Sequence, residues 1–422
     1  MTARRLWNAL GPGILLAATS VGASHLVLSP QAGAQFGYAL LWLVVVAHLV
    51  KYPAFEFGPR YAAATGRSLL DGYARMPGPK HWALLVFLTG TLAQGIAVLA
   101  GVVSVAGCVL WTWTGALSTE WFSVALAAVI LALLLVGGFS WLDLLNKVMM
   151  AVLALATVVA FVRIIPGPEA LERLVVPSLP PGSIVLAAAI LGWMPTGIDV
   201  SVWHSFWTIE KLRTTGQGGD ASRAARLHRL RTALWDMRAG YGLSLCTGLM
   251  FVIMGAVHLQ GFGAKLRDVE FVGALSTAYT ALLGPWMYHV FMLTAFFAMF
   301  STSYTVVDGF SRSFSECCAV LRPAMAAPPI RRRLYLGFVV ASTLLACVIL
   351  VRVGNPVTLA TAGAMISLGV APLLYVFNLY CVVRHLDDPV LRPSKLSVGI
   401  ALVGIAGTLV ALGASLYVKL LA

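Results

Sequence analysis

Two short stretches decide the fold: SVGASH at residues 20–25 and GWMPTG at residues 192–197. Each lies within an apolar segment that is long enough to cross a bilayer. Pro195 has no N–H and disrupts the helical turn before it, while Gly22 and Gly197 allow backbone angles that other residues avoid. Unwound backbone at membrane depth is tolerated only where it lines a cavity or contacts protein. Paired interruptions of this kind predict a transporter site at the middle of the membrane.

The composition places most of the chain in lipid. Of the 422 residues, 59% are hydrophobic and 11% are charged, whereas soluble domains carry roughly 25% charged residues. A soluble fold of this size could not cover so much apolar surface, so we expect the lipid bilayer to be a partner. The net charge of +13 comes mainly from Lys and Arg in short loops between apolar segments. That pattern indicates membrane topology and no nucleic-acid binding.

Apolar segments of about 20 residues, the length that crosses a bilayer, recur along the whole chain. We predict an all-α polytopic membrane protein with eleven transmembrane helices in a single transmembrane domain, residues 1–422. The predicted spans are 11–34, 37–58, 83–110, 119–138, 141–165, 183–207, 237–259, 281–306, 333–353, 356–383 and 397–420.

The Lys and Arg residues between these spans set the predicted orientation. With a cytoplasmic N-terminus, most basic residues fall on the cytoplasmic side, including those of the 211–238 loop, and the C-terminus lies outside. The short loops and the Ala-, Leu- and Arg-rich usage indicate a bacterial protein, so the predicted location is the cytoplasmic (inner) membrane. No cleavable signal peptide is expected, because the first apolar stretch lacks a small-residue cleavage site.

Three motifs near the start of the chain resemble a known family. GPG at residues 11–13, QAGAQFGY at 31–38 and LW at 41–42 are similar to the first helix and its exit in the Nramp (natural resistance-associated macrophage protein) family of divalent-metal transporters. The resemblance implies the LeuT-type fold of the wider APC superfamily, in which two inverted five-helix repeats provide alternating access around broken helices 1 and 6. The implied repeats cover about 10–165 and 183–383, followed by the extra helix 397–420.

The resemblance stops at the residues that bind metal in the family. Nramp metal transporters carry Asp-Pro-Gly-Asn in the helix 1 break, where this chain has GASH at residues 22–25. The family's helix 6 motif is Met-Pro-His, and here Met194-Pro195 is followed by Thr196. Its helix 3 acidic residues, associated with proton movement, correspond to the neutral Thr91 and Gln94. Mn²⁺ and Mg²⁺ require several oxygen ligands, usually including a carboxylate, so we predict no metal site.

The leading functional prediction is a secondary active transporter, a symporter, for a small polar organic solute, with an amino acid favoured. Small residues at 22–24 leave room for such a solute, and the half-helix beginning near Ser24 offers N–H groups to a carboxylate. Two alternatives stay open. One is a divalent metal ion transporter of the manganese or iron type, in which His25 and Met194 would also suit a softer ion. The other is a non-transporting sensor on the same fold.

The predicted substrate-binding residues surround the two breaks: Ser20, Gly22, Ala23, Ser24, His25, Leu191, Gly192, Met194, Thr196 and Gly197. Coupling or gating is assigned to Asp199, Gln94, Thr91 and Trp193. Structural alternatives exist for several of these residues. Gln94 and Thr91 line the pathway or form hydrogen bonds between helices, and Trp193 gates the site or packs at the interface. His25 binds substrate or a proton, or it bonds to a neighbouring helix. Asp199 binds an amine, a proton or a coupling cation, or it pairs with an Arg. No cofactor is expected beyond a coupling ion, H⁺ or Na⁺, and the protein is expected to be a monomer.

The remaining polar and aromatic residues are given structural roles. Lys51 in helix 2 is expected to extend toward the membrane surface, and Glu56 to form a salt bridge. Packing is favoured over gating for Trp203 and Trp207. The six Cys residues have no metal-ligand spacing and are interpreted as packing residues. No enzyme is predicted, because the sequence contains no His-Glu-x-x-His, Gly-x-Ser-x-Gly or nucleotide-binding loop.

Overall fold

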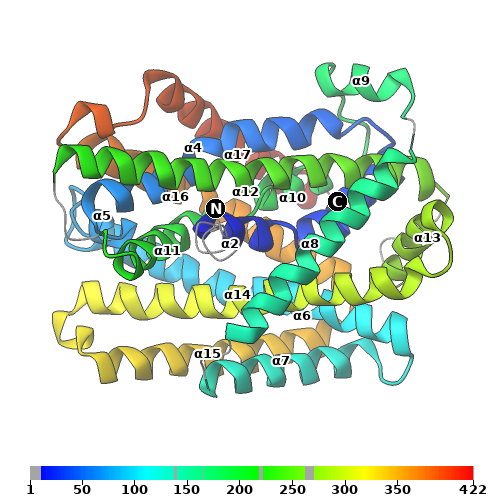
Figure 1. Ribbon diagram of the computed structural model, residues 1–422, viewed down its shortest axis with the longest axis horizontal. Coiled ribbons are helices and arrows are strands. Elements are labelled where there is room, and N and C mark those ends of the chain that lie inside the picture. Colours follow the sequence, from blue (N-terminus) through cyan, green and yellow to red (C-terminus); the bar gives the residue numbers. More distant parts are fainter. Residues whose placement is uncertain (1–10, 137–139, 165, 218–221, 262–269, 422) are drawn as a thin grey trace.

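The structure is a computed structural model that describes residues 11–136, 140–164, 166–217, 222–261 and 270–421. Every regular element in these ranges is a helix (Figure 1), which confirms the predicted all-α class. Eight of the described helices are long and apolar enough to cross a membrane, so the chain is a multi-pass membrane protein. They are α4 (Leu41–Thr65), α6 (Trp82–Thr114), α7 (Thr119–Val136), α12 (Arg223–His258), α14 (Met287–Leu321), α15 (Pro328–Val353), α16 (Pro356–Arg384) and α17 (Lys395–Leu421).

The first and sixth predicted spans are interrupted, as the two short stretches indicate. Span 1 consists of α2 (Pro12–Ser20), a π-helix (Ser24–Leu28) and α3 (Ser29–Phe36). Span 6 consists of α10 (Ile184–Trp193) and α11 (Val200–Thr214), and residues 194–199 between them are not helical. None of these helical pieces is long enough to cross a bilayer alone. The full count of eleven spans and the inverted repeats stay predictions.

Shorter helices connect or flank the spans: α5 (Leu69–Tyr73), α9 (Pro168–Val175), α13 (Phe271–Leu283) and two 3₁₀ turns, Pro323–Ala326 and Pro389–Leu391. α8 (Ser140–Val162) has 23 residues and corresponds to the predicted span 141–165. Several long helices differ from their predicted ends. α4 continues to Thr65, beyond 58, and α15 begins at Pro328, before 333. α12 begins at Arg223, not at 237, because Ser222 caps it by accepting a hydrogen bond from the Ala225 N–H at 3.2 Å. α14 continues to Leu321, beyond 306. The extensions of α12 and α14 are polar, so the search for apolar stretches misses them. The predicted ends at 138 and 165 lie outside the described residues.

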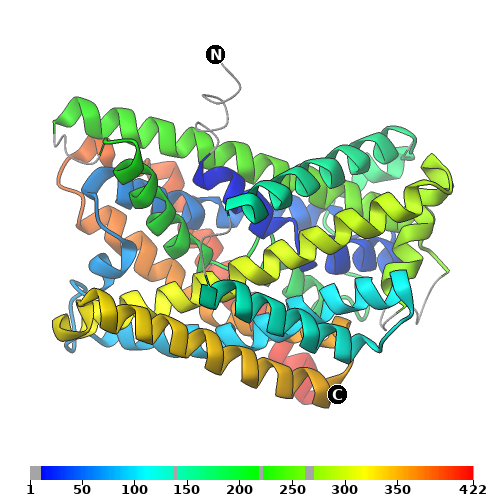
Figure 2. The same cartoon turned by 60° about the horizontal axis from the view of Figure 1, so that its bottom comes forward.

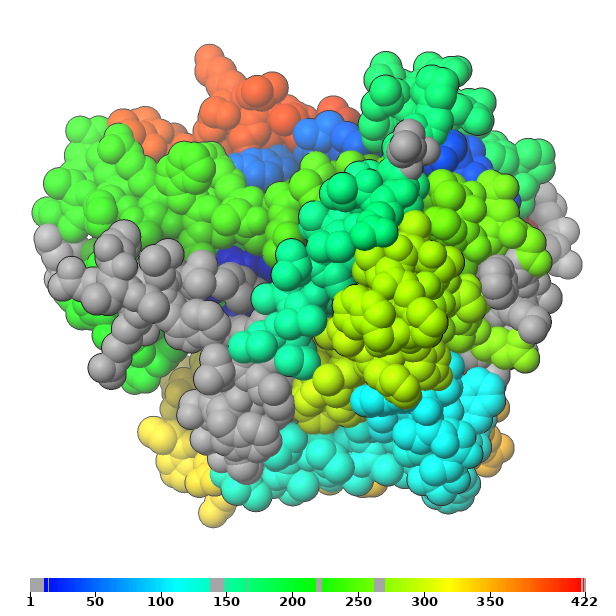
Figure 3. Space-filling model, turned by 45° about the vertical axis from the view of Figure 1, so that its right-hand side comes forward, coloured from blue at the N-terminus to red at the C-terminus, as the bar shows by residue number. Residues whose placement is uncertain are grey.

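Most of the long helices run roughly along the longest axis of the molecule (Figures 1 and 2). α6 is central, because it packs against α7, α14, α15 and α16. α17 is peripheral, and its Leu402, Val403 and Val410 side chains are exposed, as expected for a surface that lipid covers. Figure 3 shows another face, where α8, α12 and α13 lie against one another. The broken spans lie inside this arrangement, which gives them protein neighbours on most sides.

Glycines allow α3 to approach α12 closely. A Cβ atom at Gly255 of α12 would collide with the backbone of Pro30, and one at Gly33 of α3 would collide with the backbone around Val252. Small residues on both sides of a contact are typical of helices that pack tightly within membranes. This contact fixes the second half of span 1 against α12.

Five of the arginines predicted to be cytoplasmic line one surface depression, and two of them belong to α12: Arg67, Arg75, Arg213, Arg226 and Arg229. Their common location agrees with a single cytoplasmic face, because positive residues accumulate on that side of membrane proteins.

Candidate functional site

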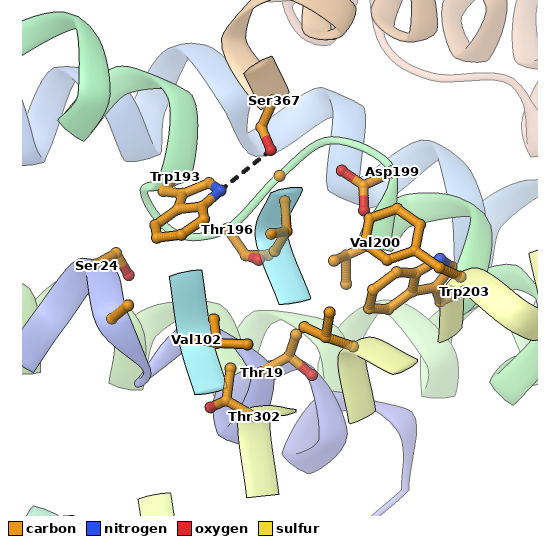
Figure 4. Close-up of a pocket in the computed structure, with 15 residues that line it drawn as sticks. Thr19, Ser24, Val102, Trp193, Thr196, Asp199, Val200, Trp203, Thr302 and Ser367 are labelled. Carbon is orange, nitrogen blue, oxygen red and sulfur yellow. Dashed lines mark hydrogen bonds between the residues drawn. The ribbon is translucent and has the colours of Figure 1, made fainter. Parts of the chain in front are cut away.

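A small cavity lies between the two interrupted spans (Figure 4). Its volume is about 30 Å³, which is room for about two water molecules. One part of its wall is apolar or aromatic and includes Trp193, Trp203 and Phe310. The polar part comes from four of the helical segments and the span 6 break, and consists of Thr19, Ser24, Thr196, Asp199, Thr302 and Ser367. The cavity therefore offers one carboxylate and five hydroxyl groups.

The predicted site residues divide between this cavity and its surroundings. Ala23, Ser24, Thr196 and Gly197 line the cavity, together with the predicted coupling residues Asp199 and Trp193. In the view of Figure 4, the Thr196 side chain lies between Ser24 and Asp199. The structure places the other predicted residues around the cavity, outside its lining: Ser20, Gly22, His25, Leu191, Gly192, Met194, Thr91 and Gln94.

Gly22 has a steric role at the edge of the cavity. A Cβ atom at this position would lie 2.8 Å from the Thr302 Oγ1 atom of α14. Glycine therefore allows Thr302 to approach the span 1 break, where its hydroxyl becomes part of the cavity wall.

Asp199 is the acidic side chain of the cavity. It lies directly before α11, and its exposed fraction is 5%. No Lys, Arg or His nitrogen among the described residues lies within 4.0 Å of its carboxylate oxygens. The alternative of a structural ion pair with an Arg is therefore absent from this structure. Carboxylates at membrane depth are costly and rare, and one without an ion pair is a candidate for binding a cation.

His25 points away from the cavity toward α12. Its ring is fully buried, and Nε2 lies 2.9 Å from the Ser244 carbonyl oxygen. The other ring nitrogen, Nδ1, lies 2.9 Å from the Ser24 hydroxyl. Ser244 in turn reaches His48 of α4, since its hydroxyl lies 3.2 Å from His48 Nε2. His25 is therefore bonded to a neighbouring helix, which is the structural alternative considered for it. Its ring contacts the cavity only through the Ser24 hydroxyl.

Met194, Thr91 and Gln94 are likewise buried outside the cavity lining. Met194 faces α12, because a methyl group placed on Gly248 would contact the Met194 Cε atom at 3.4 Å. Gln94 donates a long hydrogen bond of 3.4 Å to the Gly90 carbonyl. Among the described residues, no group of three or more His, Cys, Asp or Glu side chains is arranged to hold a metal ion. A soft metal ion would therefore find no cluster of nitrogen and sulfur ligands there.

The interpretation of Lys51 as a side chain that extends to the membrane surface is wrong. Its exposed fraction is 0%, and its ammonium group donates three hydrogen bonds to backbone carbonyls of the span 6 break. The break leaves carbonyl oxygens without helical partners, and they lie closer to Lys51 than the surface does. Glu56 does form the predicted salt bridge, with Arg60 on the next turn of α4.

The sequence interpretation also missed three hydroxyl groups of the cavity: Thr19 on α2, Thr302 on α14 and Ser367 on α16. Ser367 accepts a hydrogen bond of 3.1 Å from the indole N–H of Trp193 (Figure 4). Thr19 lies next to the predicted site residue Ser20 and could have been included. Single hydroxyl residues are common in membrane helices, and Thr302 and Ser367 lie within helices that are continuous, although Gly369 and Pro372 are near Ser367. Their place in the site follows only from tertiary packing.

The comparisons with known proteins agree with this architecture. The sequence profile described as "Natural resistance-associated macrophage protein-like" matches residues 13–420. "Uncharacterized protein PM0681" of Pasteurella multocida is 30% identical over 73% of this chain and 70% of its own length. "Divalent metal cation transporter MntH" of Deinococcus radiodurans is 29% identical over 67% of this chain, but the match spans only 63% of that transporter. The crystal structure of the Eremococcus coleocola manganese transporter has a TM-score of 0.70 at 14% identity, over 98% of this chain and 87% of its own.

A bundle of membrane-spanning helices that encloses a cavity between two interrupted spans defines the class of secondary transporters. Within that class, the chain belongs to the Nramp family. This membership confirms the resemblance of its N-terminal motifs. It also agrees with the expectation of a transporter and not an enzyme.

Proposed function

We propose that this chain is a secondary transporter whose cargo is a small hard cation, with a divalent metal ion favoured, bound beside Asp199. This proposal reverses the order of the two candidates from the sequence, where an organic solute led. The names of the relatives favour a divalent cation. The observation that carries the proposal is the Asp199 carboxylate, which has no Lys, Arg or His nitrogen of the described residues within 4.0 Å and faces a cavity that also holds five hydroxyl groups.

The lining suits a hard ion that keeps part of its water shell. Mg²⁺ and similar ions are bound through one or two carboxylates and retain several waters. Asp199 would supply the carboxylate. Thr196, Ser24 and the neighbouring hydroxyls would take the place of most of the waters, because the cavity has room for only about two water-sized groups. The softer ligands, His25 and Met194, face α12, so zinc or copper is disfavoured. The small volume of the cavity also suits an ion better than an amino acid in this conformation.

A small organic solute is the second candidate, and a specific observation supports it. Trp193, Trp203 and Phe310 line the same cavity, and aromatic side chains supply large contact areas for organic ligands. Transport of such a solute requires the cavity to widen when the helices move.

Uptake by purified protein in liposomes tests the proposal. We expect saturable uptake of Mn²⁺ or Mg²⁺ by the wild type, and a loss of at least about tenfold in Asp199→Asn, because the substitution removes the anionic ligand. Asp308→Asn is the matched control, since Asp308 pairs with Arg312 outside the cavity; its uptake should stay within about twofold, as expected for a surface pair. An absence of divalent-ion uptake, together with saturable thermal stabilisation by an amino acid or organic acid, would select the second candidate.

The cell location and coupling ion belong to the same proposal. The distribution of Lys and Arg supports a cytoplasmic N-terminus, and the bacterial relatives support a location in a bacterial cytoplasmic membrane. Na⁺ is proposed not to be the coupling ion, because the Lys51 ammonium group occupies the carbonyls of the span 6 break, which leaves H⁺ as the candidate of the two.

A further inference from the structure

The ammonium group of Lys51 fills the break of span 6, although Lys51 belongs to α4. Its Nζ atom donates hydrogen bonds of 3.0 Å to the Leu191 carbonyl, 3.0 Å to the Gly192 carbonyl and 2.6 Å to the Thr196 carbonyl. An ammonium group has three N–H donors, so three acceptors satisfy it completely. A neutral amine has two N–H donors and would leave one of these close contacts without a proton. The geometry therefore favours the charged form.

These carbonyls are available because the helix stops. In a continuous helix, the Leu191 carbonyl would accept from the N–H of residue 195 and the Gly192 carbonyl from that of residue 196. Residue 195 is proline and has no N–H, and α10 ends at Trp193. Buried carbonyls without partners are costly. Lys51 supplies the missing donors from a neighbouring helix.

The charge of Lys51 is balanced mainly by these carbonyl dipoles. No carboxylate oxygen among the described residues lies within 4.0 Å of its Nζ atom. The Asp199 carboxylate attracts the Lys51 charge from a greater distance. His48 lies one turn earlier on α4, and the centroid of the Phe55 ring lies 5.9 Å from Nζ. A ring of carbonyl oxygens without a close anion is the environment that proteins offer to a monovalent cation such as K⁺. Here the protein's own side chain occupies that environment.

We propose that Lys51 is a built-in cation, a positioning residue that holds the span 6 break in shape and takes the place of a free monovalent ion. This break then binds no Na⁺, and its carbonyls are not available to the cargo. The inference concerns the break itself and does not depend on which cargo the cavity carries. If the chain is a transporter as proposed, a consequence is that its structure and uptake are independent of Na⁺.

Chemical rescue in the full-length purified protein tests this inference. Lys51→Ala removes the ammonium and leaves a space beside the carbonyls, so we expect its melting temperature to fall by several °C. Ammonium or methylammonium chloride should restore much of the loss in a saturable way, and Na⁺ or K⁺ should restore part of it. Choline chloride at the same ionic strength is the control, because its quaternary nitrogen has no N–H group to donate. Lys51→Met fills the space without a charge and should respond to none of these salts.

The wild type completes the test, since its melting temperature should not change when choline replaces Na⁺ at constant ionic strength. A saturable stabilisation of the wild type by Na⁺ that Lys51→Met abolishes would place a free ion at the break and overturn the inference. Wild-type stability in Lys51→Met, with no response of Lys51→Ala to any cation, would show that Lys51 only fills space. If neither variant folds, a saturable stabilisation of the wild type by Na⁺ would overturn the inference, and a melting temperature independent of Na⁺ would support it. These readouts measure stability, so a failure to transport metal ions would leave them unaffected.

Discussion

His25 Nε2 lies 2.9 Å from the backbone carbonyl oxygen of Ser244, which joins the broken span 1 to α12. A carbonyl oxygen only accepts, so Nε2 carries a proton, and in the neutral ring Nδ1 is then an acceptor. The Ser24 hydroxyl lies within reach of both Nδ1 and the Ser20 carbonyl, at 2.9 Å and 3.0 Å. It has one proton to donate, so the state of the histidine decides where this cavity hydroxyl points.

Two substitutions of His25 separate its two contacts. The amide nitrogen of His25→Gln reaches about as far as Nε2 and can still donate to the Ser244 carbonyl, whereas His25→Asn reaches only as far as Nδ1, toward Ser24. We expect His25→Gln to stay within about 1 kcal/mol of the wild type in free energy of unfolding, and His25→Asn to lose about 1–3 kcal/mol. Denaturation monitored by tryptophan fluorescence measures this difference. Equal stability of the two variants would show that the bond to Ser244 is not the important one.

The N-terminal end of α2 is fixed by Asp236 of α12, whose carboxylate accepts hydrogen bonds from the Gly11 and Gly13 N–H groups at 3.3 and 3.1 Å. The first N–H groups of a helix need such acceptors, and losing one costs about 0.5–2 kcal/mol. Asp236→Ala should therefore accelerate hydrogen–deuterium exchange within residues 12–20 by roughly 2- to 30-fold. Exchange in α17, which makes no contact with this carboxylate, is the internal control. Unchanged exchange in α2 would mean that its packing alone holds it.

The contact between α3 and α12 depends on glycine at position 255. A Cβ atom there would lie 2.9 Å from the Pro30 Cα atom and even closer to the Pro30 carbonyl. Gly255→Val should therefore push the two helices apart and reduce the free energy of unfolding by about 1–3 kcal/mol. Gly242→Ala on the same helix is the matched control, because a Cβ atom at Gly242 meets nothing within 4 Å. It should be neutral or stabilising by up to about 1 kcal/mol, since alanine favours helices. Similar melting curves for the two variants would contradict the tight contact.

The interrupted spans could be predicted from sequence because their causes are local. A proline without an N–H and glycines at mid-membrane depth act on the residues beside them, and Ser24, Thr196 and Asp199 entered the predicted site for that reason. Helix ends were harder to predict, since α12 begins in the polar segment at Arg223. Hydropathy locates the apolar part of a helix and says little about a polar extension.

The remaining site residues depend on contacts between distant segments. Lys51 donates to carbonyls about 140 positions further along the chain. Its expected position near the membrane surface therefore did not predict its contacts. Thr302 and Ser367 reach the cavity only because α14 and α16 pack beside the breaks. His25 and Met194 adjoin the breaks in sequence, yet both face α12. Proximity in sequence identified the breaks and did not determine which side chains face the cavity.

Trp193 provides a test that distinguishes the two candidate cargoes. Its indole N–H donates to the Ser367 hydroxyl at 3.1 Å, and Gly363 of α16 makes room for the ring, since a Cβ atom there would lie 2.9 Å from Trp193 Cζ2. Trp193→Phe keeps an aromatic wall but changes its area and shape.

A hard cation is held by oxygen atoms, so its uptake by Trp193→Phe should keep a KM within about threefold of the wild type. An organic cargo in contact with the ring would lose about 0.5–1.5 kcal/mol, a rise in KM of up to about tenfold. Ser367→Ala is the control, because it removes the hydrogen bond and keeps the whole indole ring in the wall. A Mn²⁺ or Mg²⁺ uptake assay in which Trp193→Phe raises KM tenfold, while Ser367→Ala has no effect, would contradict an ion held by oxygen ligands.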